Sequence, residues 1–160
     1  MAKSIHQWFA KYNQSHQNST NKLIHFICVP LIFISIIGLL TYIKLTPSID
    51  AKPNLFPYFN LGELLILIAL IFYLRLSVPI FIGMAIFSIA IYLPMRYAIL
   101  KTDFPVWVVC SIIFVLAWIG QFYGHKIEGK KPSFFTDLLF LLVGPAWILG
   151  FIFKKWGIKF

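Results

Sequence analysis

Charged residues are scarce in this chain, and acidic ones most of all. Only 12% of the 160 residues are charged, and just 5 are Asp or Glu, whereas an ordinary soluble domain is roughly 25% charged. Hydrophobic residues make up 60% of the chain, and the mean hydropathy is +0.85. A soluble helical domain needs polar helix faces, which the long apolar runs here lack. The composition therefore predicts an integral membrane protein, and the length predicts a single domain over residues 1–160.

Cysteine and the common catalytic motifs are also scarce or missing. The 2 cysteines, Cys28 and Cys110, lie inside apolar segments, which favours buried, reduced thiols over a disulfide framework. The sequence contains no HExxH, no GxSxG, no P-loop and no paired catalytic carboxylates, so those enzyme templates fit poorly. No basic run exceeds two residues, so the net charge of +9 indicates an anionic membrane leaflet or an anionic ligand rather than nucleic acid.

Long hydrophobic runs are what the chain does have. A membrane-spanning helix needs about 20 apolar residues, and most of the five runs approach that length. The prediction is an all-α, polytopic membrane bundle of four to five hydrophobic helices. An N-terminal helix within Ala2–Tyr12 is expected to lie in the membrane interface, with Trp8 at head-group level. The five apolar segments are Leu23–Ile43, Leu61–Leu74, Leu76–Met95, Phe104–Tyr123 and Phe134–Phe153.

Polar residues gather where two of these segments meet a polar stretch. One cluster is His16-Gln-Asn-Ser-Thr-Asn21-Lys-Leu-Ile-His25, and the other is Trp118-Ile-Gly-Gln121-Phe-Tyr-Gly124-His125-Lys-Ile-Glu128. The first opens the first apolar segment and the second closes the fourth. Three further crossings return the chain to its starting side, so both clusters are predicted to face the same side of the membrane.

Helical spacing decides which of these side chains can converge. Asn21 and His25 are four residues apart and share one helix face. His16 can join His25 only if the helix breaks between them, and the capping residues Asn18–Thr20 supply such a break. His6 lies off the apolar face of its helix and is interpreted as a solvated histidine.

In the second cluster, Gln121, His125 and Glu128 form one stripe, and Gly120 and Gly124 allow another helix to approach closely. Ionisable groups at membrane depth are costly, so each needs a reason. Interhelical hydrogen bonds would explain any one of them alone.

Three histidines together with Asn21 and Glu128 on one side favour a metal ion instead. Two histidines and a carboxylate with open positions are typical of non-haem Fe(II) oxygenases. Asn21 and Gln121 could orient the metal ligands through hydrogen bonds without binding the metal themselves. The spacing by itself does not name the metal.

The motifs also carry a resemblance. His16-x4-Asn21-x3-His25 followed by Val29-Pro30-Leu31, and Gln121-Phe-Tyr-Gly-His125-Lys-Ile-Glu128-Gly-Lys-Lys-Pro132, resemble the two signatures of the fungal 2-hydroxy fatty acid dioxygenase family. Asp137-Leu138 and Gly144-Pro145 are similar to its C-terminal segment. Gln17 stands where fungal members carry a second histidine, and the chain looks more like a bacterial branch.

The resemblance implies Fe(II)-dependent α-oxidation that does not use 2-oxoglutarate. A long-chain 2-hydroxy fatty acid and O2 would give the fatty acid one carbon shorter, with the alkyl chain lying among the spans next to membrane lipid. The implied metal and catalytic residues are His16, His25, His125 and Glu128. Lys130 and Lys131, with Lys126, would steer the substrate carboxylate or serve as positive-inside residues.

The competing class is a non-catalytic membrane protein, either a zinc-stabilised bundle or a lipid-binding adaptor. Tightly held zinc without oxygen uptake would identify it. Fungal relatives act at the endoplasmic reticulum, and the bacterial inner membrane is the expected location here. If the fifth segment turns back at Gly144-Pro145 rather than crossing, ten Lys and Arg residues lie on the histidine side and four on the other, so the site is predicted to face the cytoplasm.

Overall fold

The fold is entirely helical in the described part of the chain, which confirms the predicted all-α class. The computed structural model describes residues 4–48, 55–131 and 139–160. Within them lie α1 (Ile5–Asn13), α2 (Ser19–Leu40), α3 (Leu61–Leu76), α4 (Val78–Lys101), α5 (Val106–Glu128) and α6 (Phe140–Lys155).

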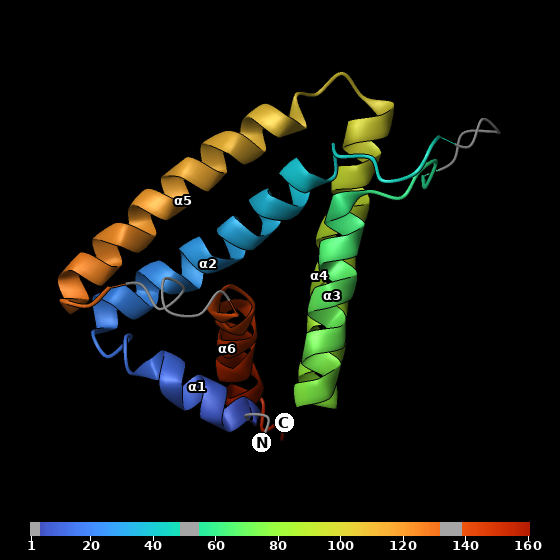
Figure 1. Ribbon diagram of the computed structural model, residues 1–160. Coiled ribbons are helices and arrows are strands. Elements are labelled where there is room, and N and C mark those ends of the chain that lie inside the picture. Colours follow the sequence, from blue (N-terminus) through green and yellow to red (C-terminus); the bar gives the residue numbers. More distant parts are fainter. Residues whose placement is uncertain (1–3, 49–54, 132–138) are drawn as a thin grey trace.

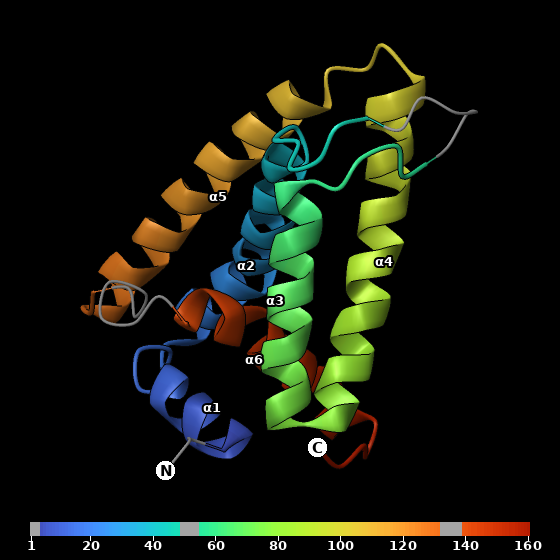
Figure 2. The ribbon, with the colours of Figure 1, turned by 45° about the vertical axis from the view of Figure 1, so that its right-hand side comes forward.

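The helices form two antiparallel pairs that diverge from one end of the molecule (Figure 1). α2 and α5 make the most extensive contact between any two of these helices, and α3 packs on α4. Helices α1 and α6 lie together at the end where the chain begins and finishes (Figure 2). Because α2, α3, α4 and α5 alternate in direction, the first turn of α2 and the last turn of α5 meet at this same end.

Side-chain caps set where these helices begin. The Asn18 side chain accepts hydrogen bonds from the backbone N–H groups of Thr20 and Asn21, at 2.9 and 3.2 Å. Asn60 caps α3 in the same way and forms a reciprocal capping box with Glu63. Such caps satisfy N–H groups that have no partner within the helix. The predicted break between His16 and His25 therefore exists, at Asn18.

Three of the described helices, α2, α4 and α5, are long and apolar enough to cross a membrane. This is fewer than the four to five spans expected from the sequence. Helices α3 and α6 each have 16 residues, or about 24 Å at 1.5 Å per residue, which is less than the roughly 30 Å hydrocarbon core. Large apolar side chains are exposed along the outer faces of the bundle, Ile86, Leu116 and Ile119 among them, as expected for a lipid-facing surface.

The expected turn at Gly144-Pro145 is wrong, because α6 continues through both residues as one helix. Pro145 lies in the second turn, where it removes the hydrogen bond to the carbonyl of residue 141 and its ring crowds that carbonyl. Gly144 packs tightly, since a Cβ there would lie 3.0 Å from a methyl carbon of Val29. The first six residues of the predicted segment, 134–139, fall mostly outside the described residues. The two termini nevertheless lie at the same end of the molecule (Figure 1).

Helix α1 has the predicted apolar face, but that face packs against protein rather than lipid. Ile5, Trp8, Phe9 and Tyr12 are all buried. The Trp8 ring is 5.5 Å from the ring of Phe140 on α6 and 6.4 Å from that of Phe72 on α3. Trp8 therefore contacts protein rather than lipid, and its position at head-group level stays a prediction. Helix α1 is instead part of the core that closes this end of the bundle.

The arrangement predicts which ends of the chain share a membrane side. In a variant without Cys28 and Cys110, single cysteines at Lys11, Lys159 and Lys101 should be tested with a membrane-impermeant thiol reagent. Lys11 and Lys159 lie at the end that carries both termini, and Lys101 ends α4 at the other. We expect the first two to be protected in intact cells and Lys101→Cys to be labelled. Opposite labelling of Lys11→Cys and Lys159→Cys would contradict the shared side, and labelling of both would reverse the orientation.

Candidate metal centre

His16 reaches the interior because α1 ends just before it. Helix α1 stops at Asn13, whose side-chain oxygen accepts a hydrogen bond from Trp147 Nε1 of α6 at 2.7 Å. The chain then turns inward before Asn18 starts α2, and His16 has no exposed surface. The break between α1 and α2, together with the hydrogen bond between Asn13 and Trp147, points the His16 side chain toward the α2–α5 pair.

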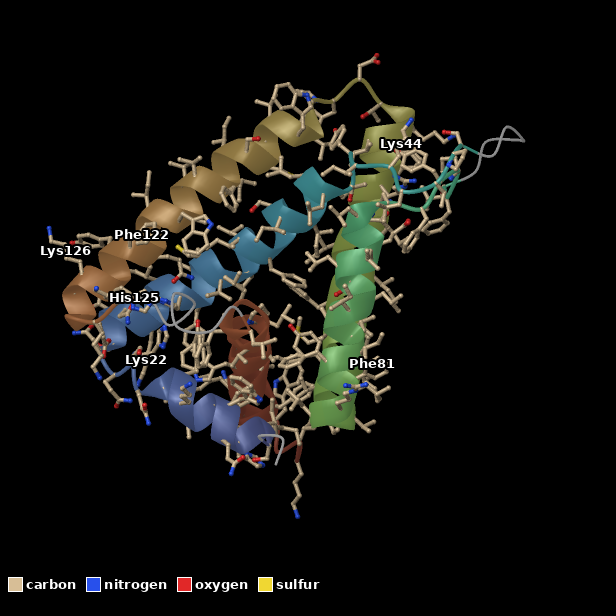
Figure 3. The ribbon with its side chains drawn as sticks, in the orientation of Figure 1. Lys22, Lys44, Phe81, Phe122, His125 and Lys126 are labelled. Atoms are coloured by element: carbon tan, nitrogen blue, oxygen red, sulfur yellow. The ribbon has the colours of Figure 1, made fainter. Side chains whose placement is uncertain are left out.

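His25 and His125 meet because α2 and α5 approach each other closely. A Cβ at Gly120 would lie 2.7 Å from Cys28 Sγ, and one at Gly124 would overlap the side-chain oxygen of Asn21. A larger residue at either position would force the side chain of Cys28 or Asn21 on α2 to move, so the predicted close approach is confirmed. Figure 3 labels His125 beside Lys22 and Lys126 at this end of the molecule, with Lys44 at the other end.

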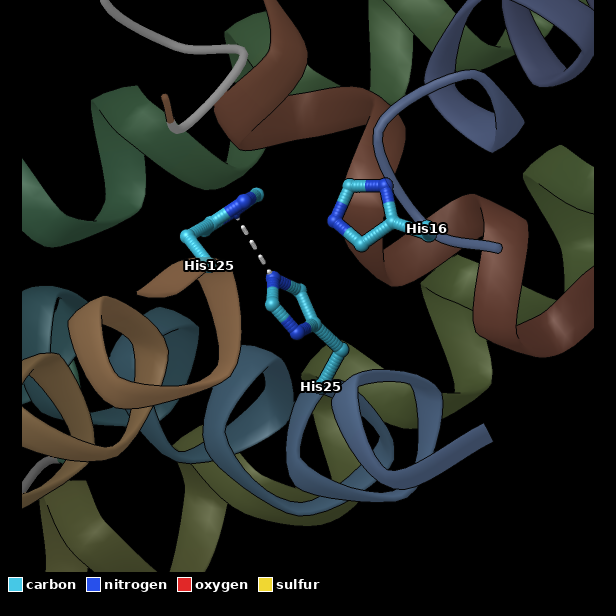
Figure 4. Close-up of side chains that lie close together, drawn as sticks. All are labelled: His16, His25 and His125. Carbon is cyan, nitrogen blue, oxygen red and sulfur yellow. Dashed lines mark hydrogen bonds between the residues drawn. The ribbon is translucent and has the colours of Figure 1, made fainter. Parts of the chain in front are cut away.

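The three histidines form one compact, buried group. Each offers a ring nitrogen, and these nitrogens all lie within 4.8 Å of one another. The Nε2 atoms of His25 and His125 are 3.1 Å apart. The three rings face one another at steep angles (Figure 4), with interplanar angles of 68°, 74° and 90°. Among the described residues, this is the single cluster of three potential metal ligands.

Backbone carbonyls hold two of the rings in the orientation that a metal requires. His16 Nδ1 lies 2.6 Å from the Tyr12 carbonyl oxygen, and His25 Nδ1 lies 2.9 Å from that of Asn21. A carbonyl oxygen can only accept, so each Nδ1 carries the proton and each Nε2 presents a lone pair. Metal-bound histidines are held in this way in most known sites.

The third histidine completes the fit. Because His25 Nε2 has a lone pair, His125 Nε2 must donate to it when no metal is bound. That leaves His125 Nδ1 buried without a partner, and His16 Nε2 is likewise buried without one. Buried polar atoms without partners are rare and costly. A metal ion held by the three imidazoles would accept one lone pair from each ring, including that of the unpartnered His16 Nε2, so the residues present fit such an ion.

Burial also keeps the group in its metal-binding form. Desolvation lowers the pKa of His16 below its usual value, while the Tyr12 carbonyl and the charge of Glu128 oppose that shift more weakly. His16 is therefore neutral at pH 7, and neutral imidazole is the form that binds a metal.

Glu128 lies outside this group, although the sequence predicted it as a ligand. Its carboxylate accepts hydrogen bonds from the backbone N–H of Gln17 at 2.7 Å, from that of Asn18 at 2.9 Å and from Asn21 Nδ2 at 3.0 Å. All three donors belong to the loop after His16 or to the first turn of α2. Glu128 therefore ties the end of α5 to the segment that positions His16.

The other predicted residues lie around the cluster. Asn21 donates to Glu128 and to the Ser15 carbonyl, and Gln121 lines the same cavity as His16 and His125. Lys130 donates to the Gln14 carbonyl on the same loop, and Lys131 is exposed. His6 is exposed beside Phe160, with ring centroids 5.8 Å apart, and has no place in the cluster.

A cavity of about 130 Å³ opens from the histidines into the bundle. A few polar side chains, those of Tyr12, His16, Gln121 and His125, form part of its lining, and the remaining lining residues are apolar. Residues of α1, α2, α3, α5 and α6 line it, and of the apolar ones the sequence motifs had included Val29 and Trp118. The lining residues are Tyr12, His16, Val29, Ile32, Phe33, Ile36, Leu65, Trp118, Gln121, His125, Phe140, Leu141 and Leu142.

Tyr12 and Trp147 are site residues that the sequence reading missed. The Tyr12 ring stacks on the His16 ring, with centroids 4.1 Å apart and planes 12° from parallel. Trp147 contacts both rings, at 5.1 and 5.5 Å. The i, i+4 spacing of Tyr12 and His16 was a usable signal, but Trp147 looked like any other apolar residue of its segment.

These features define a class: helical proteins with membrane-length apolar helices and a buried cluster of three histidines, able to hold a metal ion, beside an apolar cavity. The chain belongs to the 2-hydroxy-palmitic acid dioxygenase Mpo1-like family, whose family model matches residues 2–156. The resemblance noted from the sequence motifs is thereby confirmed at the level of the family. No curated protein and no solved structure gives a significant match to the chain.

The cluster predicts which histidines bind metal. Replacing His16, His25 or His125 by Ala removes one of three ligand nitrogens. Loss of a residue that only hydrogen-bonds to a ligand typically costs about 10–100-fold in metal affinity, so we expect each of these variants to lose at least about 100-fold. His6→Ala is the matched control and should keep full affinity. Metal content after equilibrium dialysis measures this, with circular dichroism in detergent to verify folding. Retained metal in any of the three, or loss in His6→Ala, would contradict the assignment.

The Glu128 contacts predict an indirect effect on the same site. Glu128→Ala releases the loop that carries His16, so we expect metal affinity to fall by about 10–100-fold, and Glu128→Gln to lose less because its carbonyl oxygen can still accept. Glu63→Ala is the control, because Glu63 also ties a helix N-terminus but at the far end of the molecule. It should lower stability by about 1 kcal/mol and leave metal affinity unchanged. Equal affinity in Glu128→Ala and the parent protein would exclude the positioning role.

Proposed function

We propose that this protein is an Fe(II)-dependent dioxygenase that shortens long-chain 2-hydroxy fatty acids by one carbon. The observation that carries the proposal is that His16 and His125 line one end of a cavity whose other walls are almost wholly apolar. An amphiphile with a metal-binding head and an alkyl tail matches this division. The family description, which names a 2-hydroxy-palmitic acid dioxygenase, supports the same substrate class.

The protein supplies three neutral nitrogen ligands on one side of the site. Bound Fe(II) would provide the redox chemistry with O2, and three ligands leave further coordination positions for substrate and oxygen. A 2-hydroxy acid can chelate a metal through its hydroxyl and carboxylate oxygens, so no 2-oxoglutarate is needed. In the overall reaction the 2-hydroxy acid and O2 give the acid one carbon shorter, CO2 and water, which balances all atoms.

The remaining residues of the site would bind the substrate and shield its head group from water. The apolar walls contributed by α2, α3 and α6 would hold the alkyl tail and exclude water from the head. The hydrogen bonds of Glu128 and Asn21 hold the His16 loop against the end of α5. Lys126 and Lys131, exposed next to the site, would attract the anionic substrate to this end of the molecule.

Oxygen consumption tests the proposal. Protein purified without oxygen and loaded with Fe(II) is expected to consume about one O2 per 2-hydroxypalmitate and to release pentadecanoate, measured with an oxygen electrode and mass spectrometry. Palmitate, which lacks the hydroxyl, should cause no uptake. His25→Ala, which lacks a ligand nitrogen, should be inactive, and His6→Ala should retain activity.

The same preparation distinguishes the non-catalytic alternative. A protein that holds zinc tightly, exchanges it slowly for Fe(II), and shows no uptake with any 2-hydroxy acid is a zinc-stabilised or lipid-binding bundle. Uptake that requires added 2-oxoglutarate would contradict the proposed cofactor requirement while retaining the iron site.

A further inference from the structure

Tyr12 is placed to contact anything bound at the histidine cluster. It lies in the last turn of α1, its carbonyl oxygen holds His16 Nδ1, and its ring stacks on the His16 ring. The same side chain lines the cavity together with His16 and His125. The backbone and the ring of Tyr12 thus serve His16, while its hydroxyl extends beyond the histidine ring.

The hydroxyl of Tyr12 has no partner within the described residues, although only 5% of the side chain is exposed. The other deeply buried tyrosines are satisfied. Tyr73 donates to the Leu142 carbonyl at 2.8 Å, and Tyr92 donates to Glu63 at 2.7 Å. The Tyr12 oxygen is not among the fully buried polar atoms that lack a partner, and Tyr12 lines the cavity, so its hydroxyl is available to donate to a bound ligand. Burial also raises the pKa of Tyr12, which keeps the hydroxyl protonated and able to donate.

The space around this hydroxyl is kept open by a glycine. A Cβ at Gly144 of α6 would lie 3.1 Å from Tyr12 Oη and 3.0 Å from Val29. Any larger residue would press on the tyrosine ring and move it relative to His16. The close fit holds the ring in one orientation and therefore fixes where the hydroxyl points.

The cavity lining offers few hydrogen-bond donors to a bound carboxylate. Among the described residues that line it, none is a lysine or an arginine, and the nearby Lys130 is bonded to the Gln14 carbonyl. A carboxylate taken into such a cavity needs donors to replace its lost water. Tyr12 supplies a phenolic hydroxyl that can donate a hydrogen bond at the part of the cavity lined by His16 and His125.

We propose that the Tyr12 hydroxyl donates a hydrogen bond to the carboxylate of the bound 2-hydroxy acid and so sets the orientation of the substrate head. This role rests on the proposed function, because it assumes that the head group binds at the histidines. It makes Tyr12 a substrate-binding residue in addition to a support for His16.

Tyr12→Phe tests the role, because it removes the hydroxyl and keeps the ring that stacks on His16. Binding is measured by calorimetry in detergent, without oxygen, on Fe(II)-loaded protein. The ligands are 2-hydroxypalmitate and 1,2-hexadecanediol, which has the hydroxyl but no carboxylate. A hydrogen bond to a charged group corresponds to roughly a 10- to 100-fold change in Kd. We expect that loss for the acid and a change of less than about twofold for the diol. Metal content should be unchanged.

Tyr97→Phe is the matched control, because Tyr97 is exposed on α4 at the far end of the molecule, and both ligands should bind it as they bind the parent. An unchanged Kd of the acid in Tyr12→Phe overturns the role of Tyr12 while leaving the proposed function intact. An equal loss for acid and diol also overturns it, since the hydroxyl would then shape the cavity rather than bind the carboxylate. If the parent protein binds no 2-hydroxy acid at all, the proposed function fails, and this role fails with it.

Discussion

The close contact between α2 and α5 is the constraint on which the rest of the site depends. Gly120 and Gly124 bring the two helices near enough for His25 and His125 to place their Nε2 atoms 3.1 Å apart. In a lipid environment this contact gains little from the hydrophobic effect, so tight packing and buried hydrogen bonds must stabilise it. Glu128 and Asn21 add those bonds at the end of the pair, and the same bonds hold the His16 loop in position.

The site is therefore assembled from segments that are far apart in the chain, namely the loop before α2, α2 itself and the end of α5. His16 belongs to a short loop whose position is determined by α6 through Trp147 and by α5 through Glu128. Each imidazole is oriented by a backbone carbonyl or by a neighbouring histidine, so small shifts of these helices would change the tautomers. The cost of burying three neutral imidazoles is offset when a single metal ion accepts their lone pairs.

Helices α1 and α6 give the cluster its surroundings. They are too short to span a membrane, and they pack on each other at the end that carries the histidines. Their aromatic side chains close the cavity from below, and the first turn of α6 contributes Phe140, Leu141 and Leu142 to its wall. A cluster of three histidines thus adjoins a largely apolar cavity inside the bundle, a division that suits the proposed amphiphilic substrate.

The sequence by itself determined the helical class, the break at Asn18, the shared side of His16, His25 and His125, and the approach at Gly120 and Gly124. These follow from apolar run length, capping chemistry and the alternation of helix direction, which are local or countable properties. Only the tertiary structure decided that Glu128 holds a loop rather than joining the histidines, that Trp8 packs against protein, and that α6 continues as one helix through Gly144-Pro145. Those outcomes depend on which distant donors and side chains surround each residue, because a carboxylate, a tryptophan or a proline is compatible with several environments and packing selects one.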